Sequence, residues 1–185
     1  MRSDAQANRD RVLAAAEEVF GESGEAGSTE EIARRAGVGI GTVFRHFPTK
    51  QLLVEATVVR HLALLTATAR ARAEDGGEAG EAFRTTFREL ISGAPAKLAL
   101  LALRERTGAP DDSADEVRAA ALRLRDAVEV LLSRGQEAGE VRADTTVDEV
   151  YVLIRALANT RGDRSVVDGA VGVVLDGLAP RRSGA

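Results

Sequence analysis

The sequence predicts an all-α fold, in which an N-terminal three-helix bundle with a helix-turn-helix precedes a larger C-terminal helical domain. Alanine, leucine, arginine and glutamate are all frequent among the 185 residues, and aromatic residues make up only 3%. All four are good helix formers. Apolar residues also recur at helical spacing along most of the chain, and two short helical patterns are joined by a glycine turn at residues 37–39. We place the domain boundary between residues 49 and 50.

The composition argues against several classes of protein. The chain has no cysteine, so disulfides, thiolate metal sites and cysteine nucleophiles are excluded. There are two histidines, and we find no metal-spaced ligand cluster, no phosphate loop and no paired carboxylates on an apolar face, which argues against an enzyme. No apolar run approaches the roughly 18 residues that a membrane span needs. We therefore expect a cytoplasmic protein with no cofactor and no metal.

The first predicted helix covers about residues 9–22. Val12, Leu13, Ala16, Val19 and Phe20 recur there at helical spacing, and this apolar face should support the next two helices. The preceding residues 1–8 are polar, so we expect them to form a terminal arm outside the bundle.

Residues 28–53 are the stretch around which the chain is organised. Ser28 and Glu31 make a capping box at the start of a short helix, and Gly37 is placed to end that helix in the left-handed conformation. A second helix of about two turns follows, with Val43 and Phe47 facing the interior. Two short helices joined by a glycine turn are typical of a helix-turn-helix, which places its second helix in a DNA major groove.

The charge pattern also favours a nucleic-acid contact in this stretch. The chain has a formal charge of -4, yet no acidic residue occurs between Glu31 and Glu55. The basic residues of this segment, with one histidine, are Arg34, Arg35, Arg45, His46 and Lys50. A local basic face on an acidic protein is suited to phosphate contact.

The run IARRAGVGIGTVFRHFPTKQLL, residues 32–53, resembles the DNA-binding domain of TetR-family transcriptional regulators. The shared pattern is Ile-Ala, then Ala-Gly-Val, then an aromatic residue, Phe, Lys and Leu at fixed spacing, and the match covers roughly residues 10–55. The resemblance implies a helix-turn-helix DNA-binding domain at 1–49 and an effector-binding and dimerisation domain at 50–185. It further implies a homodimeric repressor, released from a palindromic operator in double-stranded DNA by a small-molecule effector of unknown identity.

Carried onto this sequence, the resemblance makes Lys50 a phosphate anchor and Thr42 a DNA contact, and Arg45 is suited to pair with a guanine. The aromatic position that usually carries a hydroxyl is Phe44, so a hydrogen bond to phosphate worth about 1–2 kcal/mol is missing. Ile40 lies between two glycines and is placed to touch a thymine methyl. The candidate DNA-binding residues are Ser28, Thr29, Gly39, Ile40, Gly41, Thr42, Phe44, Arg45, His46, Thr49 and Lys50.

Six further helices are predicted after the helix-turn-helix. The first covers 50–73, and its apolar stripe is Leu53, Ala56, Val59, Ala63 and Leu64. The second passes through Phe83, Phe87, Leu90 and Ile91 and ends at residues 93–95. The third covers 97–106 and is apolar nearly all round, so it should be buried. Residues 107–115 have the composition of a loop.

The last three predicted helices cover about 115–135, 147–158 and 165–178. Val117, Ala121, Leu124, Val128 and Leu132 form the stripe of the first of them. Thr146 and Glu149 make a capping box before the second. Glycines at 169 and 172 lie beside the apolar stripe of the third, where a small residue lets another helix approach closely.

These helices are expected to supply an effector pocket and a dimer interface. The candidate pocket residues are His61, Phe83, Phe87, Leu100, Leu103, Arg104, Tyr151 and Arg155, the apolar ones being equally suited to a plain core. The candidate interface residues are Val150, Ile154, Leu157, Val167, Val171, Val174 and Leu178, with closure of the monomer core as the alternative. Two other functions stay open: a DNA-binding protein of this fold without a small-molecule effector, and an all-α enzyme or protein-interaction module with a degenerate DNA site.

Overall fold

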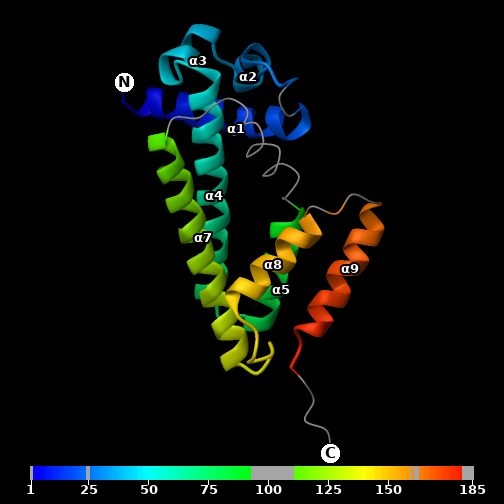
Figure 1. The fold of residues 1–185 in the computed structure, drawn as a ribbon. Coiled ribbons are helices and arrows are strands. Elements are labelled where there is room, and N and C mark those ends of the chain that lie inside the picture. Colours follow the sequence, from blue (N-terminus) through cyan, green and yellow to red (C-terminus); the bar gives the residue numbers. More distant parts are fainter. Residues whose placement is uncertain (1, 24–25, 93–110, 159, 161–162, 181–185) are drawn as a thin grey trace, which may run out of the picture. The chain divides into compact units, whose positions relative to one another are not determined.

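The computed structural model describes the whole chain except residues 1, 24–25, 93–110, 159, 161–162 and 181–185. Within these described ranges every regular element is a helix, as the sequence predicts (Figure 1). The chain divides into two compact units, Met1–Ala63 with Pro95–Ala121 and Leu64–Ala94 with Leu122–Ala185. The predicted functional boundary between residues 49 and 50 stays a prediction.

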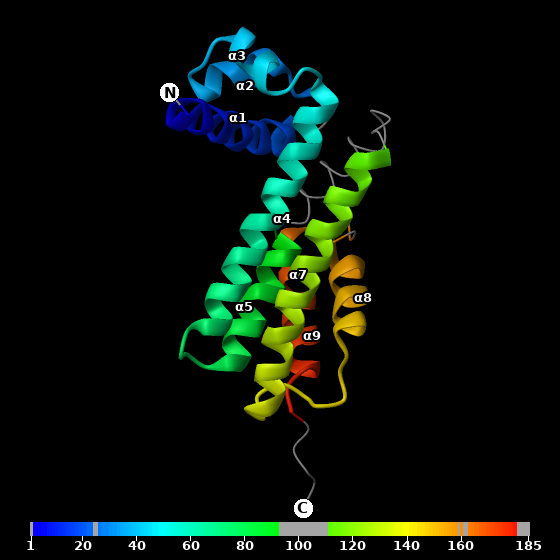
Figure 2. The same cartoon turned by 90° about the vertical axis from the view of Figure 1, so that its left-hand side faces the viewer.

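The first unit is built around three helices and the start of a fourth. Helices α1 (Arg2–Ser23), α2 (Thr29–Ala36) and α3 (Ile40–His46) gather at the N-terminal end of α4 (Lys50–Glu74) in both views (Figures 1 and 2). The predicted inner face of α1 is buried. Its side chains pack with those of α2 and α3, and the core of this unit includes Val12, Leu13, Phe20, Ile32, Val43 and Leu53.

Helix α1 begins at Arg2, so the expected N-terminal arm is wrong for the described residues. Asp4 lies in the first turn, where a carboxylate interacts favourably with the helix dipole. The side chain of Gln6 donates to Asp10 over 3.0 Å, one turn further on. Such exposed pairs extend a helix into solvent without an apolar stripe. Apolar periodicity therefore finds only the buried part of α1.

The turn between α2 and α3 forms as predicted. The Ser28 hydroxyl accepts a hydrogen bond from the Glu31 amide over 3.1 Å, and Gly37 ends α2 in the left-handed conformation with φ of 65°. The capping box is only half made, because the Glu31 carboxylate accepts from Arg34 and Arg35 instead of turning back to Ser28. Helix α2 is thus capped by Ser28 alone at this end.

The predicted stripe of α4 is wrong at its far end. Leu53 is buried, but Ala63 is exposed and the side chain of Leu64 is 48% exposed. The buried residues of this helix are Leu53, Val54, Glu55, Thr57, Val58, Leu62, Thr66 and Ala69. Because α4 is apolar on several sides, hydropathy does not identify the face that packs. By length and composition α4 would suffice to cross a membrane, contrary to the expectation from the sequence, but the buried core helix of a soluble protein meets the same criterion.

The second unit contains the later part of α4, α5 (Ala79–Ser92), the later part of α7 (Asp111–Glu137), α8 (Val147–Ala158) and α9 (Arg164–Gly177). Helix α5 packs on α8, and α8 packs on α9. Phe83 and Phe87 of α5 are both buried, with ring centroids 6.2 Å apart. The capping box of α8 is complete: the Thr146 amide donates to the Glu149 carboxylate over 2.8 Å, and the Glu149 amide donates to the Thr146 hydroxyl.

Helix α7 begins at Asp111, four residues before its predicted start, and so includes the end of the predicted loop at 107–115. Most of its predicted stripe is buried, with Ala121 exposed. The predicted helix at 97–106 lies outside the described residues.

Candidate nucleic-acid interface

Helix α3 presents one side to the core of the first unit and the other to solvent. Val43 is fully buried and Phe47, just after the helix, is 4% exposed. Ile40 and Phe44 are 39% and 44% exposed. Gly41 and Arg45 are exposed too, whereas Thr42 and His46 are half-buried. The buried Val43 and Phe47 agree with the predicted inward positions, so α3 is held from one side and leaves the other side accessible.

Two cations lie over aromatic rings of the first unit. The guanidinium of Arg9, on α1, lies 5.2 Å from the ring centre of Phe47. The ammonium of Lys50, at the start of α4, lies 5.8 Å from the ring centre of Phe20. Such contacts stabilise a cation over an aromatic face. Sequence reasoning missed Arg9, since no spacing rule connects residue 9 with residue 47.

The predicted basic face is smaller than the residue count suggests, because Arg34 and Arg35 are paired within the first unit. Arg35 lies 2.7 Å from Glu22, 2.8 Å from Glu31 and 3.8 Å from Glu18. Hydrogen bonds from Arg34 and then Arg35 lower the pKa of Glu31 to about 2. Both arginines therefore form ion pairs within α2, and Arg35 also joins α2 to α1. Among the described residues Arg45 has no ion-pair partner, which leaves its charge available.

The remaining candidates have mixed placements. Ser28 caps α2, and the Thr29 hydroxyl lies 3.4 Å from the Glu30 carboxylate. Thr49 caps α4 through a hydrogen bond from the Leu52 amide to its hydroxyl over 3.2 Å. Capping fixes the starts of α2 and α4, the two helices that flank α3.

Comparison with known proteins identifies the family to which this chain belongs. Residues 12–57 match the family model "Bacterial regulatory proteins, tetR family", and residues 78–180 match "Transcriptional regulator SbtR-like, C-terminal domain". The chain belongs to the TetR family. It is an all-α, helix-turn-helix transcriptional regulator, as the sequence motif predicted.

Solved structures of other TetR-family proteins agree along most of the chain. A TetR transcription regulatory protein from Mycobacterium vanbaalenii is 35% identical, with a TM-score of 0.82 over 96% of this chain and 98% of that one. A TetR transcriptional regulator from Streptomyces coelicolor is 33% identical, with a TM-score of 0.74 over 94% and 99% of the two chains. An HTH-type transcriptional regulator from Staphylococcus aureus strain USA300 is 41% identical over 63 residues. That match spans 34% of each chain.

The predicted pocket residues of this TetR-family chain include buried, exposed and undescribed positions, and the pocket itself stays a prediction. Phe83 and Phe87 are 1% exposed and belong to the core, Arg155 is exposed, and His61 faces α1. Leu100, Leu103 and Arg104 lie outside the described residues. Tyr151 is half-buried, and its hydroxyl is buried without a hydrogen-bond partner in the described ranges. Burial raises its pKa to about 12.

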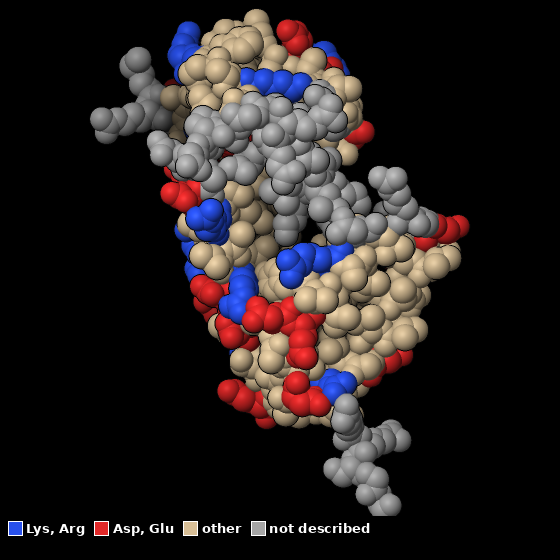
Figure 3. Space-filling model, viewed as in Figure 1, with Lys and Arg blue, Asp and Glu red and all other residues tan. Residues whose placement is uncertain are grey.

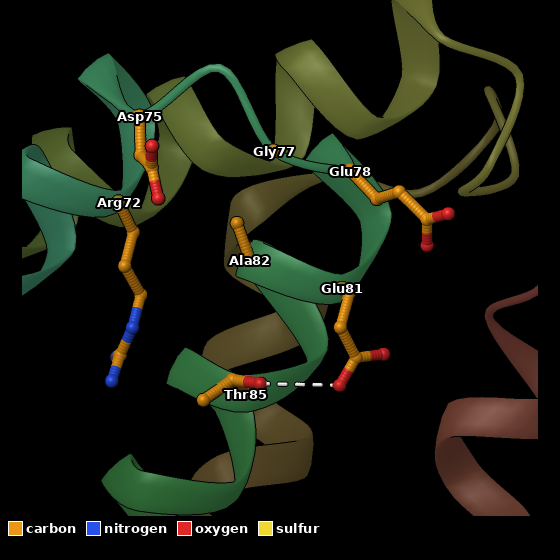
Figure 4. A pocket seen from close by; sticks show the side chains of 7 residues that line it. All are labelled: Arg72, Asp75, Gly77, Glu78, Glu81, Ala82 and Thr85. Atoms are coloured by element: carbon orange, nitrogen blue, oxygen red, sulfur yellow. Dashed lines mark hydrogen bonds between the residues drawn. The ribbon is translucent and has the colours of Figure 1, made fainter.

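Three open hollows lie on the second unit, each lined by other residues. One, of about 360 Å³, is formed by the end of α4 and the start of α5, where the Thr85 hydroxyl donates to Glu81 (Figure 4). Another, of about 440 Å³, is lined by Arg70, Ala73, Glu74, Asp126, Ala127 and Val130. The third, of about 350 Å³, is lined by Arg142, Asp144, Thr145, Glu149, Val152, Leu153 and Leu178. All three are lined in part by charged side chains.

Several predicted dimer residues are already buried within one chain. Val150, Ile154, Val171 and Leu178 are at most 7% exposed, while Leu157, Val167 and Val174 are half-buried. The valines that α8 and α9 leave exposed are others: Val152 at 57%, Val166 at 66% and Val173 at 73%. On the face in Figure 3, the area over α9 is largely free of Lys, Arg, Asp and Glu.

Proposed function

We propose that this regulator is a homodimeric repressor that reads a palindromic operator through α3 and is released by a small-molecule effector. The observation that carries the proposal is the division of α3, which holds Val43 and Phe47 in the core and leaves Ile40, Phe44 and Arg45 exposed. An exposed helix on a rigid support is the geometry of major-groove recognition.

Phosphate contacts come from cations on either side of this helix. Lys50 stands at the start of α4, and Arg9 stands over Phe47 from α1. Phosphate contacts of this kind fix the register of a protein on the duplex, while side chains of the recognition helix read the bases.

Dimerisation is assigned to α8 and α9. Gly169 and Gly172 of α9 have nothing within 4 Å of where a Cβ would stand, so the chain itself does not use their small size. Val166, Gly169 and Val173 are exposed on one side of α9, because residues three and seven apart share a helix side, and Val152 of α8 is exposed as well. A second copy packed on that face would bury it and present two recognition helices to the two halves of a palindrome.

An effector site is assigned to the second unit, with the Tyr151 hydroxyl as its polar handle. A buried hydroxyl without a partner is unfavourable by about 1–3 kcal/mol, and a ligand that hydrogen-bonds to it removes that penalty. Coupling between such a site and DNA binding is typically about 1–3 kcal/mol, which changes operator occupancy about 5- to 150-fold. A regulator of the same fold without an effector is the second candidate.

The test is binding of the purified protein to the DNA upstream of its own gene, by fluorescence anisotropy across a salt series. A specific site with a salt slope near -7 is expected, from roughly eight phosphate contacts per dimer. Arg45→Ala and Lys50→Ala should each weaken binding. The matched control is Arg123→Ala, since Arg123 is an exposed arginine on α7 in the second unit.

Two outcomes would redirect the assignment. Binding no tighter than to random DNA at any salt would mean that the helix-turn-helix is degenerate, and that the second unit carries the function as an interaction module or an enzyme. Specific binding that no ligand from a broad metabolite screen alters would favour the regulator without an effector. Loss of binding in Arg123→Ala equal to that in Arg45→Ala would contradict the assignment of α3.

A further inference from the structure

One exposed flank of α3 is apolar where a recognition helix usually carries polar groups. Successive residues of an α-helix are turned by about 100°. With Val43 and Phe47 pointing inward, Gly41 and Arg45 lie farthest from the core, and Ile40 and Phe44 share one flank between them and the core. The first turn therefore offers a glycine at its outermost position and an isoleucine beside it.

Gly41 is not required by the fold of the protein. A Cβ at this position would meet nothing within 4 Å, and the same is true of Gly39. A glycine inside a helix is also unfavourable by about 1 kcal/mol relative to alanine. Its use at the outermost position of α3 instead lets the helix backbone approach a surface closely, which brings the neighbouring Ile40 side chain to that surface.

Ile40 and Phe44 form a continuous apolar ridge, because residues four apart lie on the same side of a helix. Both remain more than a third exposed, although the interior of the same unit is formed by similar side chains. The ridge lies next to Arg45 and within the segment between Glu31 and Glu55 that has no acidic residue. These charges suit a polyanionic partner with apolar groups on its surface.

In the major groove of DNA, the apolar group that the base pairs expose is the 5-methyl of thymine. We propose that Ile40 and Phe44 read thymine 5-methyl groups in each operator half-site, and that Gly41 lets α3 sit deep enough to reach them. The inference rests on the proposed function and adds the chemical groups that are read. The position of Phe44, which cannot donate to a phosphate, becomes a base-reading position in this chain.

The test replaces single thymines by uracil, which removes the methyl and keeps the base pair. Operator sites are first selected from a random duplex library and then resynthesised with one deoxyuridine per half-site. Substitution at the contacted thymines should weaken binding about fourfold per methyl, the factor expected for one buried methyl-sized group. Substitution at thymines outside the half-sites should have no effect.

Protein variants show whether the two side chains are responsible. Ile40→Ala and Phe44→Ala should each weaken binding to thymine sites and reduce the discrimination against uracil, and the double variant should bind thymine and uracil sites equally. Phe44→Tyr keeps the ring and should keep the discrimination. Gly41→Val should fold normally yet lose specific binding. The control Leu122→Ala, at another exposed apolar residue, should behave as the unaltered protein.

The outcomes separate this inference from the proposed function. Specific binding with equal affinity for thymine and uracil at every position of the selected sites would overturn methyl reading and leave the regulator intact. Discrimination that persists in the double alanine variant would assign it to other residues and also overturn the inference. Failure to select any site would overturn the proposed function and this inference together. Thermal melts of the variants check folding. All three positions are exposed, so the melting temperatures should change little.

Discussion

Nδ1 of His61, on α4, lies 2.5 Å from Oε1 of Glu17, on α1. The other carboxylate oxygen of Glu17 accepts from Arg60 over 2.6 Å. One partly buried carboxylate thus joins the first helix of the bundle to α4. His61 had been a candidate pocket residue, and its contact with α1 gives it a role within the first unit.

This carboxylate should make stability depend on pH. The hydrogen bond with His61 lowers the pKa of Glu17 most, the charges of His61 and Arg60 lower it further, and burial opposes them. A lowered folded pKa means that the contribution is present above the ordinary value of 4.5 and is lost as pH falls through the folded value. Urea unfolding should show Glu17→Gln less stable than wild type at pH 7, with the difference shrinking below pH 4.5.

The control for this prediction is Glu18→Gln. The neighbouring Glu18 is 66% exposed and lies 3.8 Å from Arg35, so its replacement should change stability little at either pH. An unchanged stability of Glu17→Gln at pH 7 would mean that the contact does not hold α1 to α4.

Arg35 should matter for folding more than Arg34. Arg35 contacts three carboxylates on two helices, and its side chain is 28% exposed; Arg34 contacts Glu31 and its side chain is 72% exposed. Differential scanning calorimetry should therefore give a lower Tm for Arg35→Ala than for Arg34→Ala. Equal melting temperatures would contradict the linking role of Arg35.

Gly135 should tolerate no larger side chain. A Cβ there would stand 2.7 Å from Cγ2 of Val141, which is buried, and 3.6 Å from the Cα of Gly80. Overpacking of this kind destabilises by about 1–3 kcal/mol, more than alanine gains in a helix. Urea unfolding of Gly135→Ala measures the effect. Gly76→Ala, where nothing lies within 4 Å, serves as the control, and equal stability of the two variants would refute the close contact.

Val173→Glu should yield a folded monomer. The valine is 73% exposed, so a charge there disturbs one chain little, but it would be buried unpaired between two α9 helices. Sedimentation velocity should show a dimer for wild type and a monomer for this variant. Val130→Glu changes a valine that is 50% exposed on α7 and should remain dimeric. A dimeric Val173→Glu would place the interface elsewhere.

Tyr151→Phe should fold at least as stably as wild type. Removing a buried hydroxyl that has no partner in the described ranges eliminates a penalty of about 1–3 kcal/mol. Phe87→Tyr is the opposite change, since it places a hydroxyl in the core, and should destabilise. Chemical unfolding compares the two. A marked loss of stability in Tyr151→Phe would mean that the hydroxyl is satisfied in solution.

The sequence by itself determined the all-α class, the helix-turn-helix and the family, because these depend on local patterns. Ser28 and Gly37 bound α2 through contacts within a few residues, and Val43 and Phe47 are placed by helical period alone. The family follows from the same local run, which is why the comparisons agree with it.

The tertiary structure decided the features that depend on contacts between residues far apart in the sequence. The sequence predicts Arg35 as part of the basic face for DNA, but in the fold it pairs with Glu22, thirteen residues away. The sequence assigns no role to Arg9, whereas in the fold Arg9 lies over the ring of Phe47. Contacts between distant residues also decided which side of α4 is buried, and which valines of α8 and α9 lie in the core. An apolar residue can be buried by any neighbour of suitable shape, so only packing determines which surface remains for DNA and for a second copy.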